Sequence, residues 1–445
     1  MRECSRGRGG LIFAALSIGC GFVGGYFAGH PSQYVVQGGL AVFSLILFLA
    51  LAAFVLVAQV RWKERLRPWS VVVWGSLLYL GMTVGLWVTG SAELLWVADS
   101  RTLHVPGVQR AIEFLSGRGD LSMKSIYGGE QVQLVYLWGA LWALPFGLTP
   151  VVTALALLVL KVMTWLYVEK RVRENFGADV ALLAVCFLIF VPTQIFYGLV
   201  FYKEPMVQLL ASVAIFEALR FYRTGRSVAL AAAFVAISFL ALERFYLAPM
   251  IFFGVLAAMS RLVGRSNAWQ RAAMVGGALA AAGVFGFLYM RDFGEIEFFP
   301  RLARFRSDMM APSDISREWN ADLWYPLAVV KVLFTPFFTF HKFEIFRDLS
   351  ALLTWGSFAS QAVIALGCYG FWLQMRGAGA HSVGTSEARV GALIMALPLI
   401  AFILFFGYLA PYSGRQRDSF FPVIATFAAL AVIRIRERSR RRRAG

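Results

Sequence analysis

Apolar residues dominate this chain in runs of about 20, and an apolar run of that length can cross a bilayer as a helix. Short polar segments separate the runs. The pattern predicts an all-α fold, a polytopic transmembrane helical bundle. The runs that we expect to span are Leu11 to His30, Gly38 to Val60, Trp69 to Ala98, Ala181 to Val200, Pro205 to Leu219, Ser227 to Leu242, Leu247 to Ser260, Ala272 to Met290, Val390 to Leu409 and Phe420 to Ile433.

Two further regions are ambiguous, Gln131 to Val168 and Tyr325 to Met375. Each holds two apolar pieces, which are broken by Pro150 in the first region and by the polar patch 341–350 in the second. If each region crosses once in net, one piece of each pair lies at the interface or re-enters. The total is then roughly 12 crossings, with both termini in the cytoplasm.

Composition supports a membrane protein, because 59% of the residues are hydrophobic and only 15% are charged. A soluble protein of this length needs far more charge on its surface. The net charge of +17 does not indicate nucleic-acid binding, because Lys and Arg cluster between the predicted spans, as the positive-inside rule describes. These clusters lie at 61–67, 170–173, 220–226, 261–271 and 376–389 and in the tail from Arg434, which could also touch membrane lipids.

This topology assigns a definite set of segments to the outer side. Two of them are long loops, 99–130 and 291–324, and both contain apolar and aromatic residues. Such loops tend to form short interfacial helices on the membrane surface. Three tight turns, 201–204, 243–244 and 412–418, complete the outer side, so we expect any chemistry there.

Asp99 is the first candidate for that chemistry, because it opens an outer loop where an apolar run ends. A carboxylate at this place could take a proton from an incoming hydroxyl group as a general base. A plain helix cap explains its position equally well. His104, in the same loop, could orient a substrate, although an ordinary surface histidine is the simpler interpretation.

Charged pairs occupy two of the outer turns. Lys203 and Glu204 lie between aromatic residues and Pro205, where Lys203 could meet a phosphate as a point charge. Glu243 and Arg244 interrupt a stretch that is otherwise apolar from Val228 to Met259. Solvated turns would explain both pairs, but a charged pair at membrane depth is costly and often functional.

Arg415 and Arg417 lie in the last outer turn, where the positive-inside rule disfavours arginine. Two guanidinium groups there could clamp a phosphate or a diphosphate. Three acidic residues of the second long loop, Asp292, Glu295 and Glu297, could hold a divalent cation, although a solvated acidic loop is the simpler interpretation. They match no metal motif, so we predict no assigned metal site and no certain cofactor.

The order of these motifs on one side of the membrane resembles the GT-C superfamily, polytopic glycosyltransferases that use polyprenyl-phosphate-linked sugars. The matching segments run from Ala98-Asp99-Ser100 through Tyr136, Phe146-Gly147, Phe176-Gly177 and Lys203-Glu204 to Gly414-Arg415-Gln416-Arg417. The resemblance implies a GT-C-like catalytic domain over residues 69–445, preceded by two extra transmembrane helices in residues 1–68.

The resemblance also implies a mechanism. Asp99 would deprotonate an acceptor hydroxyl group, which attacks the anomeric carbon and inverts its configuration. Lys203, Arg244, Arg415 and Arg417 would bind the donor phosphate and stabilise its growing negative charge. Glu204, Glu243 and His104 would support these groups.

The implied partners are a lipid-linked sugar donor and a glycan, lipid or protein acceptor, and the implied location is a bacterial inner membrane with the active site facing outward. Two other functions stay open. One is an O-antigen-type polysaccharide polymerase or ligase, which would join oligosaccharides from a polyprenyl diphosphate. The other is a transporter or flippase for a lipid-linked sugar, which predicts charges and broken helices near the membrane midplane.

Overall fold

The structure is a computed structural model, and it describes residues 18–19, 68–96, 104–117, 133–244, 247–263, 351–376, 385–409 and 417–444. Within these ranges the regular elements are all helical. They are α3 Pro68–Val88, η1 Ala92–Leu95, α4 Val105–Leu115, α5 Leu134–Phe146, α6 Pro150–Phe176, α7 Ala178–Phe190, α8 Pro192–Leu199, α9 Glu204–Thr224, α10 Ser227–Arg244, α11 Leu247–Val263, α16 Ala351–Met375, α17 Thr385–Leu409, η4 Asp418–Phe420 and α19 Phe421–Ala444.

Six of the described helices are long and apolar enough to cross a membrane, or seven with the bent pair α7–α8. The prediction of a polytopic helical bundle is therefore confirmed. The count of roughly 12 crossings stays a prediction. The expected span at 11–30, apart from residues 18–19, lies outside the described residues. So do the expected spans at 38–60 and 272–290, the second outer loop, Asp99 and Arg415.

The first ambiguous region resolves into a short helix and a long one. α5 has 13 residues, whereas α6 has 27, enough for a span of about 40 Å. Pro150, which breaks the apolar run, is the first residue of α6, where its missing N–H costs nothing. Thr149 caps this start by accepting a hydrogen bond from the Val152 N–H at 3.2 Å.

Two predicted spans are interrupted. The run from Trp69 stops being α-helical at Val88, because Gly90 takes a φ of 70° that ends the helix before η1 begins. The run 181–200 bends by 61° between α7 and α8. Pro192 starts α8, and the preceding Val191 is extended, as a residue before proline prefers.

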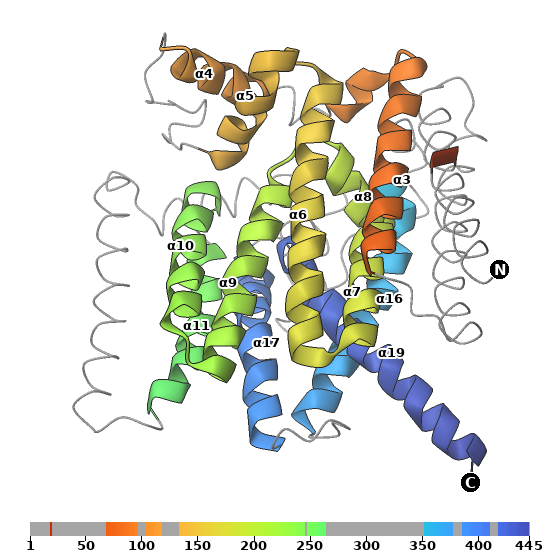
Figure 1. Cartoon of the computed structure of the whole chain (residues 1–445), viewed down its shortest axis with the longest axis vertical. Helices are drawn as coiled ribbons and strands as arrows, with labels where there is room; N and C mark the ends of the chain where they lie inside the picture. Colours follow the sequence, from red (N-terminus) through yellow and green to blue (C-terminus); the bar gives the residue numbers. More distant parts are fainter. Residues whose placement is uncertain are drawn as a thin grey trace, which may run out of the picture.

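α6 packs against α3, α5, α7, α8 and α9, and it reaches past the start of α9 toward α4 and α5 (Figure 1). α6 and α9 run parallel, since Lys161 contacts Gln208 and, further along both helices, Tyr167 contacts Glu217. A small apolar core joins α4, α5 and the first half of α6 to the turn at Phe201. The other described helices share one larger core.

The basic loop segments gather at one end of the bundle, which we call the basic end. Arg223 donates to the Asn175 carbonyl oxygen at 2.7 Å, and Arg261 donates to the Tyr222 carbonyl oxygen. The charged end of α19 leaves the bundle on this side (Figure 1). The positive-inside rule predicts that basic segments gather in this way on the cytoplasmic side of a membrane protein.

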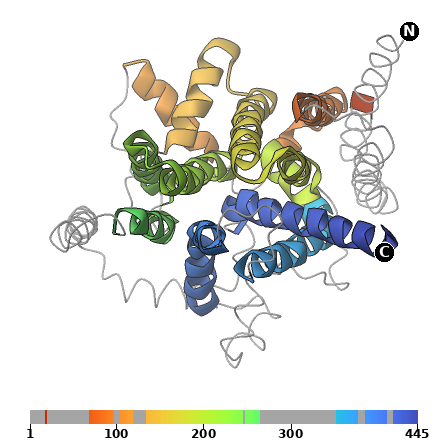
Figure 2. The same ribbon diagram turned by 60° about the horizontal axis from the view of Figure 1, so that its bottom comes forward.

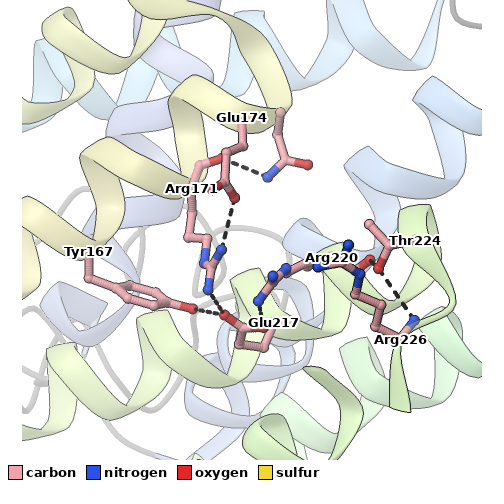
Figure 3. A network of polar contacts seen from close by, with 8 residues as sticks. Tyr167, Arg171, Glu174, Glu217, Arg220, Thr224 and Arg226 are labelled. Atoms are coloured by element: carbon pink, nitrogen blue, oxygen red, sulfur yellow. Dashed lines mark hydrogen bonds and ion pairs between the residues drawn. The ribbon is translucent and has the colours of Figure 1, made fainter. Parts of the chain in front are cut away.

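A polar network ties α6 to α9 near the basic end (Figure 3). The buried Glu217 carboxylate accepts hydrogen bonds from Tyr167 at 2.9 Å, from Arg220 at 3.3 Å and from Arg171. Arg171 also donates to Glu174 at 2.8 Å. One carboxylate therefore satisfies three donors from two helices.

α16 and α19 lie side by side, as Figure 2 shows, because glycine lets their backbones approach closely. A Cβ atom added at Gly370 would lie 1.9 Å from the Phe427 carbonyl oxygen. Since the obstacle is backbone, a side chain there forces the helices apart.

The Gly370→Ala variant should therefore lose about 2 kcal/mol of stability through overpacking. Gly391→Ala is the matched control, because its Cβ would meet only the flexible Leu219 side chain, at 3.3 Å. Thermal unfolding in detergent micelles measures both variants. Equal midpoints would contradict the close approach of α16 and α19.

Replacing Glu217 by Gln should cost about 3 kcal/mol, because it removes the buried ionic partner of Arg171 and leaves that arginine with only the exposed Glu174 among its described partners. Glu174→Gln, at a side chain that is 45% exposed, removes another partner of the same arginine and should change stability by less than about 0.5 kcal/mol. A smaller loss in Glu217→Gln than in Glu174→Gln would show that the network does not depend on Glu217.

Candidate functional site

Charged and amide side chains gather inside the bundle where α9 begins and α10 ends. We call this group the buried polar cluster. Its members come from α6, α8, α9, α10, the turn before α9 and the turn that opens η4. They are Lys161, Gln194, Lys203, Glu204, Gln208, Glu243, Arg244, Arg417 and Asp418, of which all but Lys203 are at most 5% exposed.

Glu204 and Arg244 form an ion pair between the start of α9 and the end of α10. Each charge suits its helix terminus, because a carboxylate is stabilised in a first turn and a guanidinium in a last turn. Pro205, which follows Glu204, fits the first turn of α9 for the same reason as Pro150 in α6. The local sequence thus sets the ends of the helices where the pair forms.

Glu243 connects this pair to α5. Its Oε1 atom accepts a hydrogen bond from the Val135 N–H at 2.8 Å, at the start of α5, where backbone donors lack helical partners. Lys203 and Arg244 are the cations whose charges act on Glu243. Lys203 is the partly exposed member, so it is the most accessible cation of the cluster.

Arg417 and Asp418 bring the last outer turn into the cluster. Arg417 is 2% exposed, and its guanidinium lies 3.7 Å from the Asp418 carboxylate. The Gln208 amide donates to the Asp418 carbonyl oxygen at 3.0 Å, which holds η4 against α9. Lys161 lies within electrostatic reach of both Asp418 and Glu204.

A group of aromatic residues lies against the turn that carries Lys203. His104 Nδ1 lies 3.0 Å from the Tyr136 hydroxyl, and its ring packs edge-on against Phe201 and Tyr202. The Phe201 N–H donates to the Leu95 carbonyl oxygen at 3.1 Å. The segments on both sides of Asp99 therefore contact the 201–202 turn.

The structure brings five of the eight candidate residues into one cluster, namely Lys203, Glu204, Glu243, Arg244 and Arg417. His104 lies beside them through the aromatic group and is buried, not on the surface. Asp99 and Arg415 lie outside the described residues. The roles assigned to all eight remain predictions.

The sequence analysis missed Lys161, Gln194, Gln208 and Asp418. A signal for Lys161 was present, because it is the only charged residue between Pro150 and Val168. A lone charge in the middle of an apolar run marks a polar interior. Gln194 and Gln208 carry no charge, so a search for charges in outer turns passes over them.

The cluster offers four cations against three carboxylates, together with two amides. Arginine and lysine suit phosphate oxygens, and a site that excludes water strengthens their effect on growing negative charge. Among the described residues, no three His, Cys, Asp or Glu side chains lie together as a metal site needs. The acidic residues of the second loop, which could hold a divalent cation, lie outside those residues.

The fold and the cluster define a polytopic α-helical membrane protein with charged groups inside its bundle. No protein-family model matches the chain, and no curated protein matches it. Among solved structures, one match is the crystal structure of ArnT from Cupriavidus metallidurans in the apo state. It is 12% identical, covers 78% of this chain and 76% of that chain, and has a TM-score of 0.33.

A double-mutant cycle tests the Glu204–Arg244 pair. Glu204→Gln and Arg244→Met should each cost about 3 kcal/mol, because each removes one half of a buried ion pair. The double variant should lose much less than the sum of the two. Thermal unfolding in detergent micelles provides the measurement.

The control cycle uses Arg434 and Glu437, which lie 3.2 Å apart in the more exposed part of α19. Their interaction should stay below about 0.5 kcal/mol. Additive losses at Glu204 and Arg244 would rule out the ion pair.

Proposed function

We propose that this protein is a membrane glycosyltransferase, which moves a sugar from a polyprenyl-phosphate donor to an acceptor on the extracytoplasmic face, with inversion. The observation that carries the proposal is the buried polar cluster. Burying three cations and three acids in an apolar bundle costs free energy that packing alone does not require. Cations at this place suit a phosphate whose lipid tail stays in the bilayer.

The position of the buried polar cluster along the bundle favours a site at the membrane interface. α9 begins at Glu204, α10 ends at Arg244, and η4 begins at Asp418, so three elements contribute their ends to it. The cluster lies away from the basic end, which would face the cytoplasm. The donor phosphate would therefore bind on the outer side.

Asp99 is the proposed catalytic base. Leu95 and His104, on either side of it, both contact Phe201, two residues before Lys203. Asp99 follows Leu95 by only four residues, a length of chain that spans at most about 14 Å, and this closeness in sequence supports its assignment to the same site. Asp99 would take the proton of the acceptor hydroxyl group as its oxygen attacks the anomeric carbon.

The cations have separate roles in this proposal. Lys203, the accessible one, meets the donor phosphate first, and Arg415 and Arg417 hold it as the bond to the sugar breaks. Arg244 already pairs with Glu204, so it supports the charge of the site and exchanges partners only if the phosphate displaces that carboxylate. Glu204 and Glu243 keep the cations in place.

A lipid-linked-sugar transporter or flippase is the second candidate, and one observation favours it. Gln194 lies just after the bend between α7 and α8, and it contacts Lys161 in the middle of α6. Broken helices beside a buried charge are typical of transport sites. An O-antigen-type polymerase or ligase would instead require a polyprenyl diphosphate donor.

Asp99→Asn should reduce sugar transfer by about 100-fold or more, because the variant lacks the base. The assay follows consumption of a polyprenyl-phosphate-linked hexose by the protein in nanodiscs that also contain native membrane extract as the acceptor source. Asp179→Asn is the matched control, since Asp179 is an exposed acid at the start of α7.

The same donor, with a fluorescent label, separates the two candidates in proteoliposomes. Movement of the lipid between leaflets without transfer of the sugar would reject the enzyme and support the flippase. Full transfer activity in Asp99→Asn would remove Asp99 as the base.

A further inference from the structure

Lys161 is a buried lysine for which the proposed mechanism has no role. It is the twelfth residue of α6, is 1% exposed, and stands alone as a charge between Pro150 and Val168. An ammonium group at this depth needs hydrogen-bond acceptors to offset its desolvation. The identity of those acceptors indicates what the residue does.

The acceptors are two glutamine side chains from different helices. Lys161 Nζ donates to Gln208 Oε1 at 2.9 Å and to Gln194 Oε1 at 3.2 Å. Gln208 Nε2 donates to the same Gln194 oxygen at 2.9 Å. Three side chains from α6, α8 and α9 thus form one closed triangle of hydrogen bonds.

The lysine determines which way the Gln208 amide points. An ammonium group can only donate, so the amide must present its oxygen to Lys161 and its NH2 group to the other side. On that other side, the NH2 group donates to the Asp418 carbonyl oxygen at 3.0 Å. If the amide flipped, its oxygen would face the Asp418 carbonyl oxygen, and two acceptors would repel.

The Asp418 carbonyl belongs to η4, and the preceding residue is Arg417, one of the proposed phosphate-binding residues. The contact therefore fixes the backbone from which the Arg417 side chain extends. We propose that Lys161 is a positioning residue: by orienting the Gln208 amide, it holds the 417–418 turn and places the Arg417 guanidinium for the donor phosphate. The link to the donor rests on the proposed function, whereas the hold on the turn does not.

Two variants test separate contacts in the series that runs from Lys161 through Gln208 to the Asp418 carbonyl. Lys161→Met keeps the length of the side chain but removes the donor that orients Gln208. Gln208→Glu keeps an acceptor for Lys161 but removes the NH2 group that reaches the Asp418 carbonyl. If Lys161 acts through Gln208, both variants should raise the KM for the donor by about tenfold, the loss expected for a hydrogen bond in a charged site, and should change kcat much less.

Thr164→Val is the matched control. Thr164 lies on the same helix, is fully buried, and donates to the Leu160 carbonyl of its own helix at 2.8 Å. Its replacement disturbs the interior of α6 without touching the triangle. The KM for the donor should therefore stay at the wild-type value in this variant.

A second measurement follows the turn without any assay of activity. Ser419 is 1% exposed, so a cysteine introduced by Ser419→Cys should react slowly with a maleimide. Adding Lys161→Met or Gln208→Glu should speed alkylation at position 419 by about tenfold, since a released turn opens more often. Peptide mass spectrometry distinguishes this site from the native cysteines, and Thr164→Val should leave the rate unchanged.

Together, the KM for the donor and the alkylation rate at position 419 distinguish a wrong positioning role for Lys161 from a wrong proposed function. Faster alkylation in both variants, in a protein that transfers no sugar, would support the hold on the turn and reject the transferase. Unchanged alkylation with unchanged KM would overturn the positioning role. If Lys161→Met does not reach the membrane, Gln208→Glu decides the matter, because an unchanged KM and alkylation rate in that variant would overturn the hydrogen-bonded link from Lys161 through Gln208 to the 417–418 turn.

Discussion

The structure depends on one constraint, which is that a charge buried in an apolar bundle must find a partner from another part of the chain. Lys161 meets this constraint with two glutamines, and Glu204 meets it with Arg244. Each partner lies on a different helix, so the interactions that compensate the charges also fix the helices relative to one another. The buried polar cluster is thus both a costly feature and the reason that α6, α9 and α10 have a defined arrangement.

Two sets of polar side chains connect the parallel helices α6 and α9, and they differ in how far they are exposed. The network around Glu217 includes partly exposed partners near the basic end, where solvent would reach them. Access to solvent and helix packing explain that network. The cluster around Lys161 and Glu204 is buried almost throughout, and neither explanation requires it there.

The first outer loop connects to this cluster through aromatic packing. α4 and α5 form a small core with the 201–206 segment, and His104 contacts both Tyr136 and Tyr202. α4, which lies in the loop, and α5, which follows it, are therefore at the end of the molecule opposite the basic end, and α5 contacts the cluster at Glu243 (Figure 1). This arrangement would exclude water from a bound phosphate, which is the condition under which nearby cations act most strongly.

The sequence by itself determined the membrane class, the residues at which α3, α9, α10, α11 and α19 begin, and the clustering of basic segments, because hydrophobic length and the charge of short loops are local properties. It also singled out Lys203, Glu204, Glu243, Arg244 and Arg417. Only the tertiary structure showed that Glu204 pairs with Arg244, 40 positions away, and that the uncharged Gln208 links Lys161 to Asp418. Those pairings depend on how α6, α8, α9 and α10 pack side by side, and no periodicity within a single helix encodes that packing.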